Sequence, residues 1–250
     1  MSELLQVNGQ TIAAKDIIPL LAGYQMLPHL WREIVIDQAI APFTCTPEEK
    51  DFGYQQFCAQ NQINSEATQQ AWLAHHGMTL EQLEALATRS IRIDKFKQET
   101  WGHKLESYYL SRKSQLDKVV YSLIRIKDMG LAQELYFRIK EGEQSFGEVA
   151  KTYSQGPEAQ TNGLIGMVEM STPNPAVARL LSLSQPGQVH PPIVIGEWVV
   201  IVQMEQFVPS QLDEAMQQRL LNELFAGWLQ EQLAAVSSAN PLNALNTTAK

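Results

Sequence analysis

Cysteine, positive charge and long apolar runs are all scarce in this sequence. Only two of the 250 residues are cysteines, Cys45 and Cys58, and their spacing fits neither a metal-binding nor a redox motif. Two buried thiols are expected, with a disulfide between them as the alternative. No stretch approaches the ~18 uninterrupted apolar residues of a membrane-spanning helix, so none is predicted.

The charge balance narrows the range of partners. The net charge is −8 at neutral pH, which argues against nucleic acid or an anionic membrane surface. Basic polypeptides would complement that sign. The first residues contain no basic segment followed by an apolar core, which is the pattern of a secretory signal peptide. A cytoplasmic location is therefore expected.

Motifs for metal or cofactor chemistry are also missing. His75 and His76 are adjacent on a predicted helix, where their side chains diverge and cannot chelate from one face. Gly163 and Gly166 form no phosphate loop, because no lysine follows them and strand-like residues surround them. We predict neither a metal nor a cofactor.

The first half of the chain is predicted to be helical. Asn8-Gly9 between short apolar runs indicates a tight turn, and apolar residues at helical spacing then continue to about residue 116. Capping boxes mark two of the helix starts, and they are formed by Thr46 with Glu49 and by Thr79 with Gln82. The predicted helices cover residues 16–24, 27–41, 47–61, 65–77, 79–101 and a last stretch to 116.

Two further features of the helical pattern give specific expectations. The basic residues from Arg89 to Lys97 are expected to form a solvated helix face, with a client contact as the alternative. A final helix is predicted from Pro209 to about residue 235. Its apolar stripe needs a partner, and we expect it to pack on the N-terminal helices. A polar tail is expected over 236–250.

The middle of the chain has a different pattern. Residues 119–126 are apolar and β-branched, which predicts a strand, and 131–139 have helical spacing that ends at Gly142. A second helix follows from Phe146, a strand begins near Leu164, and Ile193–Phe207 alternates as strands interrupted at Gly196. The order predicts a small α+β unit with a largely antiparallel sheet.

This middle stretch resembles the parvulin-type peptidyl-prolyl isomerases over about 118–208. The resemblance is carried by the order of elements, by FGEVAKTYSQGP, by GLIGMV at the family's glycine motif, and by PGQV before the closing strand GEWVVIVQ. The helical half, opened by VNGQTI, is similar to the chaperone domain of SurA/PrsA-type foldases. The resemblance implies a helical, chaperone-like domain over residues 1–116 and a parvulin-like domain over 117–208. It also implies a helix over 209–235 that returns to pack on the first domain.

The resemblance also assigns candidate site residues. Ser122 and Trp198 occupy the positions of the two family histidines, and Gly156 that of a cysteine or aspartate. The family's aspartate in the glycine motif is replaced by Leu164. The family residues that hold the proline ring form a proline-binding wall, and they correspond here to residues that are also apolar but smaller. The substrate-binding residues implied by the resemblance are Ile165, Met167, Val168, Pro173, Val177 and Trp198. The alternative for the wall residues is that they are simply core.

Compared with the family, the sequence retains the apolar wall residues and lacks the polar catalytic groups, and this predicts a function. The resemblance implies a folding helper or chaperone that binds unfolded or proline-containing polypeptide, with isomerase activity weak or lost. One alternative is a working isomerase in which Ser122, Tyr153 or Ser154 replaces the lost catalytic groups. Another is a dedicated adaptor that recognises one precursor peptide or export partner.

Overall fold

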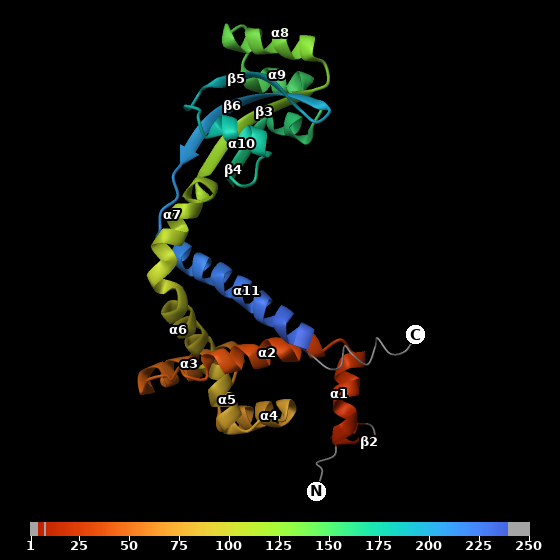
Figure 1. The fold of residues 1–250 in the computed structure, drawn as a ribbon, viewed down its shortest axis with the longest axis vertical. Coiled ribbons are helices and arrows are strands. Elements are labelled where there is room, and N and C mark those ends of the chain that lie inside the picture. The colour runs from red at the N-terminus through yellow and green to blue at the C-terminus, as the bar shows by residue number, and fades with distance from the viewer. Residues whose placement is uncertain (1–4, 8, 240–250) are drawn as a thin grey trace. The chain divides into compact units, whose positions relative to one another are not determined.

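The computed structural model describes residues 5–7 and 9–239, and these divide into two compact units. One, the helical unit, holds the residues up to Leu105 and those from Gln217 onward. The other, the sheet unit, is Glu106–Met216. Within the described ranges, no helix combines the length and apolarity needed to cross a membrane. Figure 1 labels most of the helices and strands of both units.

The helical unit begins with a small hairpin. Strand β1 (Leu5–Val7) pairs antiparallel with β2 (Gln10–Ile12); Asn8, half of the predicted turn, lies outside the described residues. The remaining elements of this unit are α1 (Ala14–Gly23), α2 (Leu27–Ile40), α3 (Pro47–Gln60), α4 (Glu66–His76), α5 (Leu80–Ala87), α6 (Arg89–Trp101), η1 (Gly102–Lys104) and most of α11 (Glu214–Ala239). The capping boxes predicted at Thr46 and Thr79 are confirmed, each closed by both of its reciprocal hydrogen bonds.

The prediction of one unbroken helix over 79–101 is wrong, because the chain turns at Thr88 between α5 and α6. The Thr88 hydroxyl donates to the Glu84 carbonyl at 2.9 Å, and its backbone N–H donates to the same oxygen at 3.1 Å. A threonine hydroxyl that competes for a carbonyl of the preceding turn bends or ends a helix. Arg92 Nη2 binds the next carbonyl, that of Ala85, at 2.9 Å.

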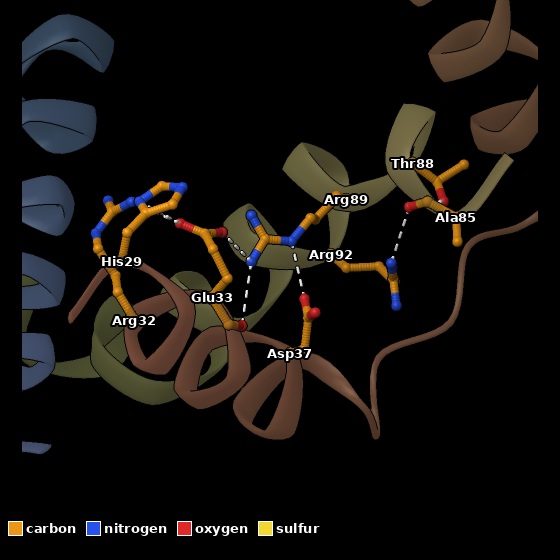
Figure 2. A network of polar contacts seen from close by, with 8 residues as sticks. All are labelled: His29, Arg32, Glu33, Asp37, Ala85, Thr88, Arg89 and Arg92. Atoms are coloured by element: carbon orange, nitrogen blue, oxygen red, sulfur yellow. Dashed lines mark hydrogen bonds and ion pairs between the residues drawn. The ribbon is translucent and has the colours of Figure 1, made fainter. Parts of the chain in front are cut away.

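The basic residues of α6 do not form the predicted solvated face. Arg89 binds two carboxylates of α2, with Nη2 at 2.7 Å from Glu33 Oε2 and Nε at 2.8 Å from Asp37 Oδ1 (Figure 2). Lys97 is 8% exposed, and its Nζ donates to Asn222 of α11 at 2.8 Å. These side chains tie α6 to its neighbours, so they are structural.

Helix α11 packs on α2 and α6 inside the helical unit. Leu229 is buried with Ile36 and Ile40 of α2. Four aromatic rings gather beside them, with centroids 5.0–6.4 Å apart, and these are Phe96, Trp101, Phe225 and Trp228. Aromatic clusters of this kind supply much of the free energy of packing.

The ends of α11 differ from the prediction. The helix begins at Glu214 instead of Pro209, because Asp213 caps it: Asp213 Oδ1 accepts a hydrogen bond from the Met216 N–H at 2.8 Å. It also continues past residue 235 to Ala239. Residues 240–250 of the predicted tail lie outside the described residues.

The sheet unit has the predicted order of elements, and the α+β fold class is confirmed. Its strands are β3 (Lys118–Ile126), β4 (Leu164–Glu169), β5 (Val189–Ile195) and β6 (Trp198–Val208), all antiparallel in the order β4-β3-β6-β5. Helices α8 (Met129–Lys140) and α9 (Phe146–Tyr153) cover one face, and α10 (Pro175–Leu181) covers the other (Figure 1). A short helix, η2 (Pro157–Thr161), precedes β4.

Helix α7 (Leu105–Leu116) belongs almost entirely to the sheet unit, so the division lies at Leu105/Glu106, not at 116/117. Side-chain hydrogen bonds fix it to the ends of the two central strands, β3 and β6. Asp117 Oδ1 accepts from Lys113 Nζ at 2.8 Å and from the Ser210 N–H at 2.7 Å. The Tyr109 hydroxyl donates to the Ser210 carbonyl at 2.6 Å.

Candidate functional site

The side chains of strand β3 alternate between the two faces of the sheet. Tyr121 and Leu123 are buried in the core on the α10 side, whereas Ile124 and Ile126 are buried under α8 and α9. Because side chains alternate along a strand, Ser122 points to the α8/α9 side. It is 4% exposed, and its hydroxyl donates to Glu205 Oε1 at 2.6 Å.

A bulge in β4 brings two of the predicted wall residues to the α10 side. Val119 lies opposite Val168 and Tyr121 opposite Ile165, so two steps of β3 match three of β4. In a regular strand Ile165 and Val168 would face opposite sides; the extra residue puts both on one side. Both are half-buried against the α10-side core.

Four of the predicted substrate-binding residues therefore meet on one face. Ile165, Val168 and Trp198 pack against the core that contains Val177, which is 3% exposed. We call these four the apolar wall. Of the two other predicted residues, Met167 is 53% exposed in the bulge, and Pro173 is buried in the loop before α10.

The other predicted catalytic groups lie elsewhere. Tyr153 packs against the core under α8 and α9. Ser154 accepts a hydrogen bond from the Arg125 N–H at 3.0 Å, and its hydroxyl donates to Glu158 Oε1 at 2.7 Å. Ser122 and Tyr153 thus lie on the α8/α9 side, away from the apolar wall, whereas Ser154 hydrogen-bonds to Arg125 and Glu158.

Gly156 is packed against a buried ion pair that sequence reasoning missed. Arg125 Nε lies 2.9 Å from Glu158 Oε1, and the Glu158 side chain is 3% exposed. A Cβ at position 156 would lie 2.3 Å from Glu158 Oε2 and 2.5 Å from Arg125 Nε. At the position that carries a cysteine or aspartate in the resembled family, a side chain would here have to displace the Glu158 or Arg125 side chain.

Tyr121 is a hydroxyl-bearing residue of β3 that faces the α10 side. It is 7% exposed and packs in the same core as Val177. Burial raises the pKa of Tyr121, the Arg125 guanidinium opposes that rise, and the Glu158 carboxylate adds to it. The phenol therefore stays neutral at ordinary pH. Because side chains alternate along a strand, Tyr121, and not Ser122, is expected on the same side as Leu123.

His190 and Ser184 form a polar pair on this face, because His190 lies opposite Val202 in the register of β5 and β6. Its Nε2 lies 2.5 Å from Ser184 Oγ, and the Ser184 hydroxyl donates to the Leu180 carbonyl at 2.6 Å. Burial lowers the pKa of His190 from its ordinary value of 6.5. No sequence motif pointed to this pair.

The lowered pKa of His190 predicts a pH effect on stability. The unfolded chain binds a proton near pH 6.5, whereas the folded chain takes it up only at lower pH. Stability is therefore expected to fall as the pH drops from 6.5 toward the folded-state pKa. Urea unfolding of wild type and His190→Gln across pH 5–8 tests this, because the other histidines are common to both. A difference that does not change with pH would contradict it.

Comparison with known proteins identifies the sheet unit. Residues 127–206 match the family model described as the PPIC-type peptidyl-prolyl isomerase, or rotamase, domain. The sheet unit contains a parvulin-type domain. The family predicted from the sequence is confirmed, and the wall, Gly156 and Trp198 are positions within this parvulin-type domain.

Longer similarities extend over the helical unit. The chaperone SurA of Cupriavidus metallidurans is 24% identical over 218 residues, which cover 76% of this chain and 44% of SurA. The chain therefore spans less than half the length of that relative. The solved structure of PrsA from Bacillus cereus is 15% identical, covers 94% of this chain and 91% of its own, and has a TM-score of 0.49. A SurA-like chaperone from Campylobacter jejuni is 16% identical, with coverages of 97% and 96% and a TM-score of 0.37.

Proposed function

We propose that this chain is a folding helper whose parvulin-type domain binds extended or proline-containing polypeptide and isomerises X-Pro bonds weakly or not at all. The proposal concerns polypeptide clients in general, as in the SurA-like proteins it resembles. Its main support is the direction of the polar side chains around the apolar wall.

Isomerisation needs a lower barrier to rotation about one amide bond. That barrier is ~18–20 kcal/mol because of the partial double-bond character of the amide. An enzyme lowers it by binding the twisted amide better than the planar one, and a single well-placed hydrogen-bond donor contributes about 3–4 kcal/mol. A domain without such donors at its wall retains binding while losing most of the acceleration.

The hydroxyls predicted to supply such hydrogen bonds already donate to other acceptors. Ser122 donates to Glu205 on the opposite side of the sheet, and Ser154 donates to Glu158. Gly156 offers no side chain, and the ring of Trp198 lies 5.2 Å from the Lys127 ammonium. The wall itself remains apolar, which suits the ring of proline or another apolar side chain.

Tyr121 supports the second candidate, a working isomerase. A neutral phenol on the α10 side can donate a hydrogen bond to a twisted amide, which is the role the lost residues would have had. The Tyr121→Phe variant removes that donor and keeps the ring. The two candidates therefore make different predictions for one assay.

The assay is X-Pro isomerisation in a set of peptides, followed by protease coupling or by NMR exchange. We expect rates equal to the uncatalysed control, or at most a few-fold above it, even at high protein concentration. Acceleration well above this level would overturn the proposal. Loss of that acceleration in Tyr121→Phe would favour the working isomerase.

Client binding is tested separately with an unfolded polypeptide. Ile165→Ser is expected to weaken binding about tenfold, because replacing a large apolar contact with serine loses ~1.5 kcal/mol or more. Met167→Ser, at an exposed position outside the wall, is the matched control and should change little. Equal effects of the two variants would contradict the assignment of the wall. Binding confined to one partner protein would favour the adaptor.

A further inference from the structure

A cavity of about 550 Å³ lies in the helical unit, among residues of the loop before α3, of α3 itself, of α5 and of α6. Its volume falls within the ~300–1,000 Å³ of pockets that hold small ligands or ligand side chains. All of its lining residues lie between Ala41 and Arg92. It is therefore built without any residue of the parvulin-type domain.

Unpaired carboxylates dominate the charge of this cavity. Asp51, Glu81 and Glu84 line it, and among the residues that the structure describes none of the three has an ion-pair or hydrogen-bond partner for its carboxylate. Two cations also line it, Lys50 and Arg92. Arg92 Nη2 donates to the Ala85 carbonyl at 2.9 Å (Figure 2), whereas its buried Nε has no hydrogen-bond partner among the described residues.

Two aromatic residues also line the cavity. Phe43 is held edge-to-face against Phe96, with ring centroids 5.9 Å apart, and Tyr54 accepts a hydrogen bond from Gln69. The pKa of Tyr54 is raised, first by burial, then by Cys58 and by the Glu84 carboxylate, so the phenol is neutral beside that negative charge. Aromatic rings combined with carboxylates attract organic cations, through the ring quadrupole and through charge-assisted hydrogen bonds.

We propose that this cavity binds a cationic side chain, the guanidinium or ammonium group of an arginine or lysine in a polypeptide. The carboxylates of Asp51, Glu81 and Glu84 pair with the cation, and the rings of Phe43 and Tyr54 flank its aliphatic stem. An anion is disfavoured, because the three carboxylates of the lining outnumber its two cations, Lys50 and Arg92. The net charge of −8 favours the same sign of ligand at longer range.

The cavity contains its own reporter, because Cys45 lines it and is a free thiol. In a Cys58→Ser protein, Cys45 is the single thiol, and its rate of alkylation can be followed while a ligand is added. The probe is Nα-acetyl-arginine amide. We expect it to slow alkylation of Cys45 in a saturable way. The neutral isostere Nα-acetyl-citrulline amide should give little protection, and protection by the arginine probe should weaken as ionic strength rises.

Charge-neutralising variants test the assigned residues. Glu84→Gln and Asp51→Asn are each expected to weaken binding of the arginine probe roughly fivefold, the size of effect of a partly screened ion pair. Glu99→Gln, at an exposed position of α6 outside the lining, should leave binding unchanged. In the reciprocal Cys45→Ser protein, alkylation of Cys58 should be insensitive to the probe.

Three results would overturn the proposal. These are absence of protection at millimolar arginine probe, equal protection by the citrulline analogue, and stronger protection by Nα-acetyl-glutamate amide. The first comparison uses the native cavity, so it holds even if a charge variant fails to fold. None of these results bears on the proposed function, which is measured with X-Pro peptides and with Ile165 variants of the other unit.

Discussion

Arg125→Ala is expected to destabilise the parvulin-type domain by about 3–5 kcal/mol, the usual effect of removing one partner from a buried ion pair. The Glu158 carboxylate is 3% exposed and has Arg125 as its only cationic partner in the described chain. Its Oε2 already lacks a hydrogen bond among the described residues. Without the guanidinium, the remaining charge would be held by the Ser154 hydroxyl alone.

Hydrogen exchange of the β3 and β6 amides measures this effect, because it reports the free energy of unfolding of that unit directly. Arg138→Ala is the matched control: its pair with Glu134 joins two side chains that are 35% and 54% exposed, and exposed pairs contribute about 0–1 kcal/mol. The double variant Arg125→Met with Glu158→Leu should regain much of the loss, since no buried charge is left unpaired. An Arg125→Ala loss no larger than that of Arg138→Ala would refute the role of the pair.

The ion pair also explains why the site was only partly predictable. Arg125 and Glu158 are 33 residues apart and lie on a strand and a short helix, so no local pattern joins them. The sequence alignment placed Gly156 at a family catalytic position, and the structure explains the glycine by close packing against that pair. The order of elements, in contrast, follows from apolar spacing and turn residues, which are local signals.

Where the structure differs from the expectations drawn from the sequence, the contacts of single side chains explain the difference. Thr88 ends a helix by bonding back to Glu84, although the apolar spacing continues through it. Ser122 was assigned to the site from its alignment, but the strand alternation that buries Tyr121 and Leu123 on one side turns it to the other. The bulge in β4 had the opposite effect, since it placed Ile165 and Val168 on one side as the resemblance required.

Substitution of Asp117 is also expected to cause a large loss of stability, because one of its carboxylate oxygens connects α7, β3 and the end of β6. Oδ1 accepts from Lys113 Nζ, from the Ser210 N–H and from the Ser210 hydroxyl at 2.7–2.9 Å, and the residue is 8% exposed. Asp117→Ala leaves the partly buried Ser210 N–H without its acceptor and Lys113 without its partner. We expect a loss of about 3 kcal/mol. Asp128→Ala, which removes only an exposed helix cap, should cost about 1 kcal/mol.

The same carboxylate predicts how stability depends on pH. Burial alone would raise the pKa of Asp117, but hydrogen bonds from Lys113 and Ser210 outweigh it and hold the pKa below the ordinary 3.8. The folded state thus favours the charged form, so the stabilisation is complete above the unfolded pKa and is lost as pH falls through the folded one. Asp117→Asn keeps the shape but not the charge. The difference in unfolding free energy between wild type and Asp117→Asn should therefore be constant from pH 6 to 8 and shrink below about pH 4. A gap that stays the same at pH 3 would mean that shape, not charge, makes the connection.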